Sequence, residues 1–147
     1  MHLWLQLGLS TFVTAIIVGL HLTGLSLLMR LIRGHHLRGA ARGALLHDAL
    51  GVAGAAIGLF VLHAAEIWLY AALYLLGGAL ASFEEALYFS TSTYATIGYG
   101  DVVLPAGWRL LGAIEGATGI ILLGWSTAFF VAVVSRIRML ELEAGER

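Results

Sequence analysis

The sequence predicts an all-α membrane protein with three transmembrane helices and one short re-entrant helix that leads into a glycine-containing loop. Hydrophobic residues make up 60% of the 147 residues and charged residues only 12%. A globular protein of this size could not bury that much apolar surface away from water. Three apolar runs are long enough to cross a bilayer, which takes about 20 residues. A shorter, capped segment lies between the second and the third run.

The first apolar run, Leu3 to Met29, contains no Asp, Glu or Arg. A cleaved signal peptide is the alternative, but such a peptide usually has a basic N-terminal region and a shorter apolar core. We therefore expect an added first transmembrane helix, which lacks the regular arginine ladder of a voltage sensor and in which His21 and Thr23 could contact a neighbour. A polar connector follows, with four arginines and three histidines: Arg30, Arg33, Arg38, Arg42, His35, His36 and His47. Residues 1–48 form this N-terminal unit.

The second run extends from about Ala49 to Leu76 and the last from about Trp108 to Ser135. Gly77-Gly78 end the second run, and Arg136 and Arg138 end the last. With three spans, both arginine clusters lie on one side, which the positive-inside rule assigns to the cytoplasm, with Arg109 as the one exception. We expect a multi-pass protein of the cell membrane whose N-terminus faces outward. Residues 49–135 form the main domain, and residues 136–147 form a short cytoplasmic tail.

The short segment between these two runs starts with Ser82-Phe83-Glu84-Glu85. Ser82 can cap a helix, and Glu85 can reach back to the start of that helix, as in a capping box. Both acids also suit the positive N-terminal end of a helix. The resulting helix, about Phe83 to Ala95, is too short to cross a bilayer, so we expect it to be re-entrant.

The loop Thr96 to Asp101 follows this helix. Non-helical backbone at membrane depth is tolerated only inside protein or beside water, so this loop must lie against protein or line a water-filled space. Its carbonyls can all point one way only if ordinary and left-handed residues alternate, and glycine reaches positive φ at little steric cost, which explains Gly98 and Gly100. Tyr99 must point away from the lined space. Asp101 ends the loop with a carboxylate that attracts cations.

The stretch Thr93-Tyr94-Ala95-Thr96-Ile97-Gly98-Tyr99-Gly100-Asp101 resembles the signature of the potassium-channel pore-domain family, most closely its bacterial two-transmembrane members. The resemblance covers about residues 49–135 and implies an outer helix, a pore helix, a selectivity filter and an inner helix in a tetrameric channel. Potassium would bind to backbone carbonyls of Thr96, Ile97, Gly98 and Tyr99, as in known filters, and the Thr96 hydroxyl would lie at the inner mouth. Potassium ions are the permeant ligand, and we expect no other cofactor.

The last span also resembles the inner helix of this family. Gly119 matches its glycine hinge, although the four glycines at 112, 116, 119 and 124 could instead permit close helix packing. Phe129, Phe130 and Val133 could form a hydrophobic gate by dewetting.

Two features depart from the family. Tyr88 and Phe89 stand where many members have Trp, yet both can wedge Tyr99, and Tyr88 can still donate to Asp101. Ser92 stands where some members place a buried acid behind the filter.

Glu115, His63 and Glu66 lie inside predicted spans and are functional hypotheses by default. Glu115 can replace the missing acid, either as a structural partner of hydroxyls on the short helix, such as Thr91 or Ser92, or as a group whose protonation modulates gating. His63 and Glu66 are three residues apart and share one helix face. They can form a structural polar pair, a proton-sensing element or a metal site, although two ligands on one helix are a weak metal signal.

The leading functional hypothesis is a potassium-selective channel gated at the inner helix. One filter occurs in the chain and a closed ring needs four, so we expect a homotetramer in lipid. The alternatives are a weakly selective cation channel, a non-conducting subunit with the same fold, and a membrane enzyme. We expect no enzyme, because no nucleophile arrangement or three-ligand metal set was recognised. A net charge of −1 leaves no basic surface for nucleic acid.

Overall fold

The computed structural model describes residues 2–38 and 44–145, and all regular structure in these ranges is helical. The four helices are α1 (Leu3–Arg38), α2 (Ala44–Leu76), α3 (Phe83–Tyr94) and α4 (Arg109–Gly145). Three of them contain segments long and apolar enough to cross a membrane, namely Leu3–Gly34, Asp48–Leu76 and Arg109–Arg136. The predicted all-α architecture with three spanning helices is confirmed.

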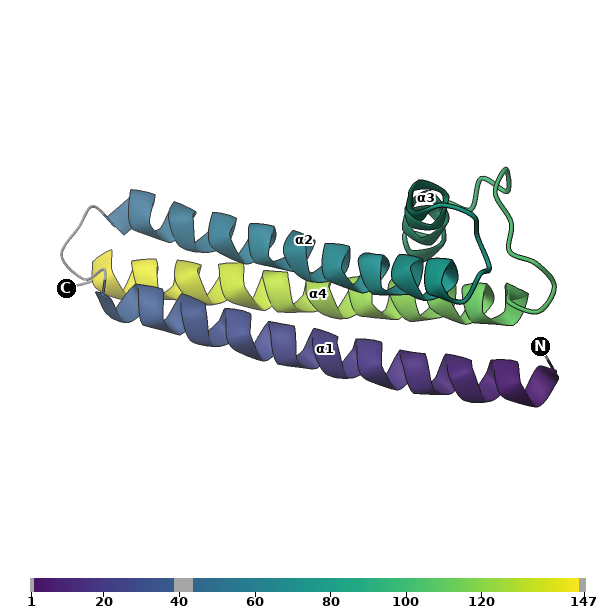
Figure 1. The fold of residues 1–147 in the computed structure, drawn as a ribbon. Coiled ribbons are helices and arrows are strands. Elements are labelled where there is room, and N and C mark those ends of the chain that lie inside the picture. The colour runs from purple at the N-terminus through teal and green to yellow at the C-terminus, as the bar shows by residue number, and fades with distance from the viewer. Residues whose placement is uncertain (1, 39–43, 146–147) are drawn as a thin grey trace.

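The three long helices lie side by side, and α3 lies at one end of α2 and α4 (Figure 1). The N-terminal end of α1 is at the end that holds α3, and the C-terminal end of α4 is at the opposite end (Figure 1). Arg30, Arg33 and Arg136 therefore lie far from α3, whereas Arg109 starts α4 beside it. This is the asymmetry on which the predicted orientation rests.

The helices are longer than the apolar runs that predict them. α1 continues past Met29 to Arg38 and α2 begins at Ala44, so most of the predicted connector is helical, and residues 39–43, including Arg42, lie outside the described residues. Arginine and leucine are good helix formers, and a helix that leaves the membrane need not end where its apolar stretch ends. The side chains of His35, His36 and His47 are also outside the described part of the chain.

The cap of α3 forms largely as predicted. The Glu85 backbone N–H donates to Ser82 Oγ at 3.2 Å. The Glu85 carboxylate reaches back one residue further than a capping box requires and accepts from the backbone N–H of Ala81 at 3.2 Å. Gly78, with φ +68°, makes the turn that ends α2, so the start and the direction of α3 are both fixed locally.

Aromatic rings hold the C-terminal end of α2, the short helix α3 and the start of α4 together. The Tyr74 ring packs edge-on against Phe89 at 5.4 Å and against Trp108 at 6.2 Å between ring centroids. The fully buried side chains of Tyr70 and Leu111 belong to the same core. This packing fixes the base from which the loop after α3 projects.

α1 packs along both α2 and α4, as expected for a helix added outside the main domain. Two glycines make the contact with α2 close. Gly24 of α1 faces Leu62 of α2, and Gly58 of α2 faces Leu28 of α1. Small residues that let helices approach closely are the usual means of helix association in lipid.

Candidate functional site

The loop after α3 has left-handed backbone at every second residue. Thr96, Gly98 and Gly100 have φ values of 59°, 57° and 82°. The positive φ of both glycines is as predicted, but that of Thr96 was missed, although the same two-residue alternation points to it. Because a β-branched residue pays a steric cost in this conformation, the surrounding contacts must hold Thr96 in place.

Those contacts come from the last turn of α3. The backbone N–H groups of Ile97 and Gly98 both donate to the carbonyl oxygen of Ser92, at 2.8 and 3.1 Å, and Thr96 N–H donates to Thr93 O at 3.0 Å. The Tyr99 N–H points at Ser92 Oγ at 3.4 Å. Ser92 thus anchors the loop with its backbone and its side chain, which gives a physical basis to its predicted supporting role.

The outer end of the loop is held by Tyr88. Its hydroxyl donates to Asp101 Oδ2 at 2.7 Å, as predicted, and its ring stacks on Tyr99 with 6.4 Å between centroids and 13° between planes. The hydrogen bond from Tyr88 holds the pKa of the Asp101 carboxyl below its ordinary value, and the same bond raises the pKa of the Tyr88 hydroxyl. Phe89, expected to share this wedge, instead packs on Tyr74 and lies beside Gly112, because consecutive helical residues face different directions.

The loop starts at about the middle of the spanning helices, and in a single chain its side chains are exposed. Glu66, which contacts the end of α3, is ten residues before the end of α2, and Gly119 is ten residues after the start of α4. At the rise of an α-helix, ten residues span about 15 Å, which is half the thickness of a bilayer core. Yet Ile97 and Tyr99 are 52% and 71% exposed. Backbone of this kind at membrane depth needs cover from protein or water.

Glu115 of α4 is fully buried beside α3. Its carboxylate accepts from the Tyr74 hydroxyl at 2.6 Å and from Ser90 Oγ at 2.5 Å. The predicted hydrogen bond to a hydroxyl of α3 is present, but the residue is Ser90 and not Thr91 or Ser92. Ser90 lies on the buried face of α3 toward α2 and α4, whereas Thr91 is exposed and Ser92 faces the loop.

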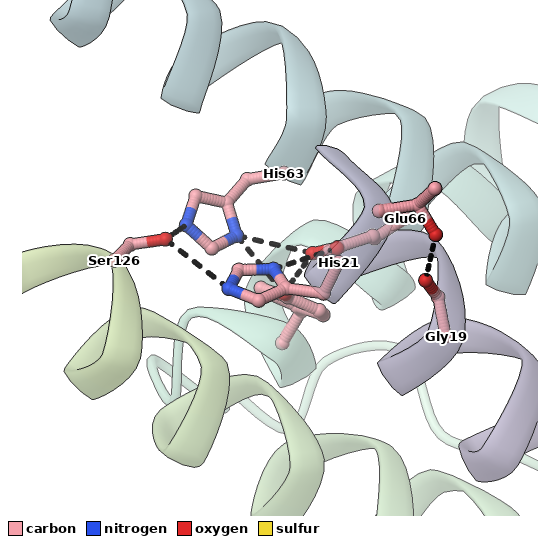
Figure 2. Close-up of polar contacts among 7 residues, drawn as sticks. Gly19, His21, His63, Glu66 and Ser126 are labelled. Atoms are coloured by element: carbon pink, nitrogen blue, oxygen red, sulfur yellow. Dashed lines mark hydrogen bonds and ion pairs between the residues drawn. The ribbon is translucent and has the colours of Figure 1, made fainter. Parts of the chain in front are cut away.

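A second buried polar cluster, which we call the His–Glu cluster, contains His21, His63, Glu66, Tyr94 and Ser126. The predicted pair is present, with His63 Nδ1 3.1 Å from Glu66 Oε2. The other Glu66 oxygen lies 2.9 Å from His21 Nδ1, and the Tyr94 hydroxyl donates to Glu66. Figure 2 shows the imidazoles of His21 from α1 and His63 from α2 side by side, next to Ser126 of α4.

His21 is the main residue that sequence reasoning missed. It was noted only as a possible contact with a neighbour. A histidine near the middle of an apolar run must pair with something, and His63 lies near the middle of the next run, so the signal was present. Ligand atoms of His21, His63 and Glu66 lie within 4.8 Å of one another.

Three glycines of α4, Gly112, Gly116 and Gly119, face α3. A Cβ on Gly119 would collide with the backbone carbonyl of Tyr94, and one on Gly116 would lie 3.3 Å from Thr93 O. Gly112 lies against Leu104 and Phe89. Close packing is therefore a role of Gly119 as well as of the other two, and α4 runs through it without interruption. The hinge remains a prediction.

The three proposed gate residues all pack against one cluster inside the subunit. Val133 is buried with Ala55 of α2, and Phe129 and Phe130 are half-buried against the same cluster. The expectation that Val133 lines a constriction is therefore wrong for this conformation, because its side chain packs inside the subunit.

A family model described as "Ion channel" matches residues 56–136, which are more than half of the chain and include α2 from residue 56 onward, α3, the loop and the spanning part of α4. The chain belongs to this ion channel family. The match is consistent with a pore of the two-transmembrane potassium-channel type, as the motif indicates. No match was found among curated proteins or among solved structures. The ion channel domain and the three apolar helices together make this a multi-pass membrane protein that acts in ion transport. α1 lies outside the matched residues.

Proposed function

We propose that four identical copies of this chain form a potassium-selective channel in a cell membrane, with residues 96–100 of each copy as its filter. The observation that carries this proposal is the left-handed backbone at Thr96, Gly98 and Gly100. Alternation of left-handed and ordinary residues turns successive carbonyl groups toward the same side of the loop. A column of carbonyls can replace the hydration shell of a potassium ion.

The carbonyls of Thr96, Ile97, Gly98 and Tyr99 are the proposed potassium ligands. They need a rigid support, and the contacts of the loop supply one. Ser92 anchors the loop from behind, and Tyr88 holds its outer end through Asp101 and Tyr99. The carboxylate of Asp101 then lies at the mouth, where it concentrates cations.

The need for four copies follows from the exposure of the loop. One chain supplies one carbonyl column and leaves Ile97 and Tyr99 exposed at membrane depth. A closed ring of four subunits would cover the outer side of each loop and enclose the carbonyl side. In this assembly the N-terminus would face outward, since Arg30, Arg33 and Arg136 lie at the end away from the filter.

The test is potassium flux into liposomes that contain the purified protein, with bi-ionic potentials for potassium against sodium. We expect selective potassium flux, block by barium and a protein mass of four chains. Gly98→Ala should abolish selectivity, because alanine in a left-handed conformation costs about 1–2 kcal/mol and moves the carbonyl. Gly8→Ala is the matched control, because a Cβ on this α1 glycine meets no atom within 4 Å.

Two results would contradict the proposal. Equal permeation of sodium and potassium through the wild-type protein would indicate a weakly selective cation channel. Folded tetramers that pass no ion at any pH or voltage would indicate a non-conducting subunit that retains the fold.

A further inference from the structure

We propose that the His–Glu cluster is a binding site for a divalent transition-metal ion of the zinc class. Its ligands are His21 Nδ1, His63 Nδ1 and the carboxylate of Glu66, with the Tyr94 oxygen in the fourth position. These atoms come from α1, α2 and α3, so a bound ion would fasten the added helix to the pore domain. The site is separate from the filter, and its binding of metal does not depend on conduction.

Three of the distances between the ligand atoms are close to those around a tetrahedral ion. Bonds of about 2.0–2.1 Å to nitrogen and oxygen place neighbouring ligands of zinc about 3.3 Å apart. His21 Nδ1 is 2.9 Å from Glu66 Oε1, and His63 Nδ1 is 3.1 Å from Glu66 Oε2 and 3.0 Å from the Tyr94 oxygen. The Tyr94 hydroxyl and the Glu66 carboxylate are hydrogen-bonded to each other and would have to move apart to hold an ion, while the ligand atoms of His21, His63 and Glu66 already lie within 4.8 Å of one another. Imidazole and carboxylate are ligands that zinc, cobalt and nickel accept.

The hydrogen count points to a missing cation. A neutral imidazole carries one hydrogen. If both imidazoles donate from Nδ1 to Glu66, both Nε2 lone pairs face Ser126 Oγ, at 2.8 Å from His63 and 3.5 Å from His21, and one serine hydrogen serves only one of them. If either imidazole donates from Nε2 instead, its Nδ1 lone pair faces a carboxylate oxygen. With Glu66 ionised, each of these arrangements leaves one contact between two lone pairs, which either a metal ion or a proton on the carboxylate would remove.

A metal ion on the Nδ1 side resolves this conflict. Both imidazoles then carry their hydrogen on Nε2, and Ser126 Oγ accepts both hydrogens with its two lone pairs. A ligating histidine that donates its other N–H to a fixed oxygen is the usual arrangement around a metal. For neutral imidazoles the change moves each proton from Nδ1 to Nε2 and releases none.

Charge favours the same conclusion. Glu66 and His21 are fully buried, and the arginines of the described spans lie at helix ends, at Arg30, Arg33, Arg109 and Arg136. A carboxylate at mid-membrane is costly unless a cation accompanies it. The His63 side chain is 13% exposed, so the cluster reaches the surface of the single chain.

The test is zinc binding to the intact purified protein in detergent, after removal of any polyhistidine tag and treatment with a chelator. We expect one zinc ion per chain in competition with a chromophoric chelator, and visible absorption bands typical of tetrahedral cobalt when Co²⁺ is used. Zinc should also raise the melting temperature. Ser126→Ala, which removes the oxygen that both Nε2 atoms face, should weaken binding about tenfold.

Variants at the ligands make the test specific. His21→Asn keeps a donor toward Glu66 but removes the imidazole ligand, and Glu66→Gln keeps the volume but removes the charge. Both should weaken zinc binding more than Ser126→Ala does, with helix content unchanged by circular dichroism. His2→Ala, at an exposed histidine, should bind zinc like the wild type.

Three outcomes would overturn the proposal. The first is a folded wild-type protein that binds no zinc. The second is binding that His21→Asn and Glu66→Gln leave unchanged. The third is a melting temperature that zinc does not raise. Because these measurements use no ion flux, failure of the metal site is distinguishable from failure of the channel.

Discussion

The Tyr88 hydroxyl donates a 2.7 Å hydrogen bond to Asp101 across the outer end of the loop, from a helix residue thirteen positions earlier. This bond and the stacking of Tyr88 on Tyr99 are the contacts through which α3 supports the proposed outer mouth. The bond stabilises the charged carboxylate, so the lowered pKa of Asp101 has a direct structural cause.

A first prediction concerns acid at the outer face. The carboxylate is charged above its pKa and becomes protonated as the pH falls through it, and Tyr88 moves this step below the usual value of about 4. Tyr88→Phe removes the donor and returns the pKa toward that value. Flux measured against external pH should therefore decline at a higher pH in Tyr88→Phe than in the wild type. Coincident pH curves would show that the hydrogen bond does not control this carboxylate.

A second prediction concerns the buried carboxylate of Glu115. Ser90→Ala removes one of its two donors and should lower the stability of the folded protein by about 1–3 kcal/mol, because a buried acceptor loses a partner. Thr91→Ala changes the neighbouring, exposed hydroxyl and should have little effect. Thermal unfolding in detergent measures both. A larger loss of stability in Thr91→Ala than in Ser90→Ala would instead support Thr91, the partner expected from the sequence.

The gating hypothesis for Glu115 has its own test. If its protonation modulates opening, Glu115→Gln should change the dependence of open probability on pH, since the amide does not titrate. Single-channel recording of both proteins across the same pH range measures this. Identical curves would leave Glu115 with a structural role only.

A fourth prediction separates the two roles of Gly119. Its missing Cβ leaves room for the Tyr94 carbonyl, so Gly119→Ala should displace α3 and cost about 1–3 kcal/mol by overpacking. Gly124→Ala is the control on the same helix, because a Cβ there meets no atom within 4 Å. A pure hinge gives the opposite pattern for Gly119→Ala, with unchanged stability and altered gating.

A fifth prediction tests how α1 is seated. Gly58→Val should push Leu28 and α1 away from α2, whereas Gly54→Val, one helical turn earlier, adds the same side chain in open space. A cysteine cross-link between α1 and α2 should form less readily in Gly58→Val only. It should also lose zinc binding, because His21 would move away from Glu66. Equal cross-linking in both variants would show that the glycine contact does not seat the helix.

Sequence reasoning predicted the features that one segment determines by itself. The three spans follow from apolar length, the start of α3 from Ser82, and the positive φ of Gly98 and Gly100 from the needs of the loop. It was less successful where two helices meet. Apolar length also says little about helix ends, so α1 was predicted too short.

The errors at helix contacts have one cause. Spacing along a helix shows which residues share a face, but it does not show which face of the next helix lies opposite. The pairing of His63 with Glu66 was therefore predicted, while the addition of His21 from α1 was not. The same limit explains why Thr91 or Ser92 was expected as the hydrogen-bond partner of Glu115, whereas Ser90 is the partner in the structure.

The end of α3 at Tyr94, directly before the loop and at about the middle of the membrane, has an electrostatic consequence. The carbonyl groups of the last helical turn point along the axis and give the C-terminal end of a helix about half a negative charge. In the proposed ring of four, four such ends would converge on one point below the filter. The short helices would then lower the energy of a cation where the bilayer penalises it most, without any charged side chain at that point.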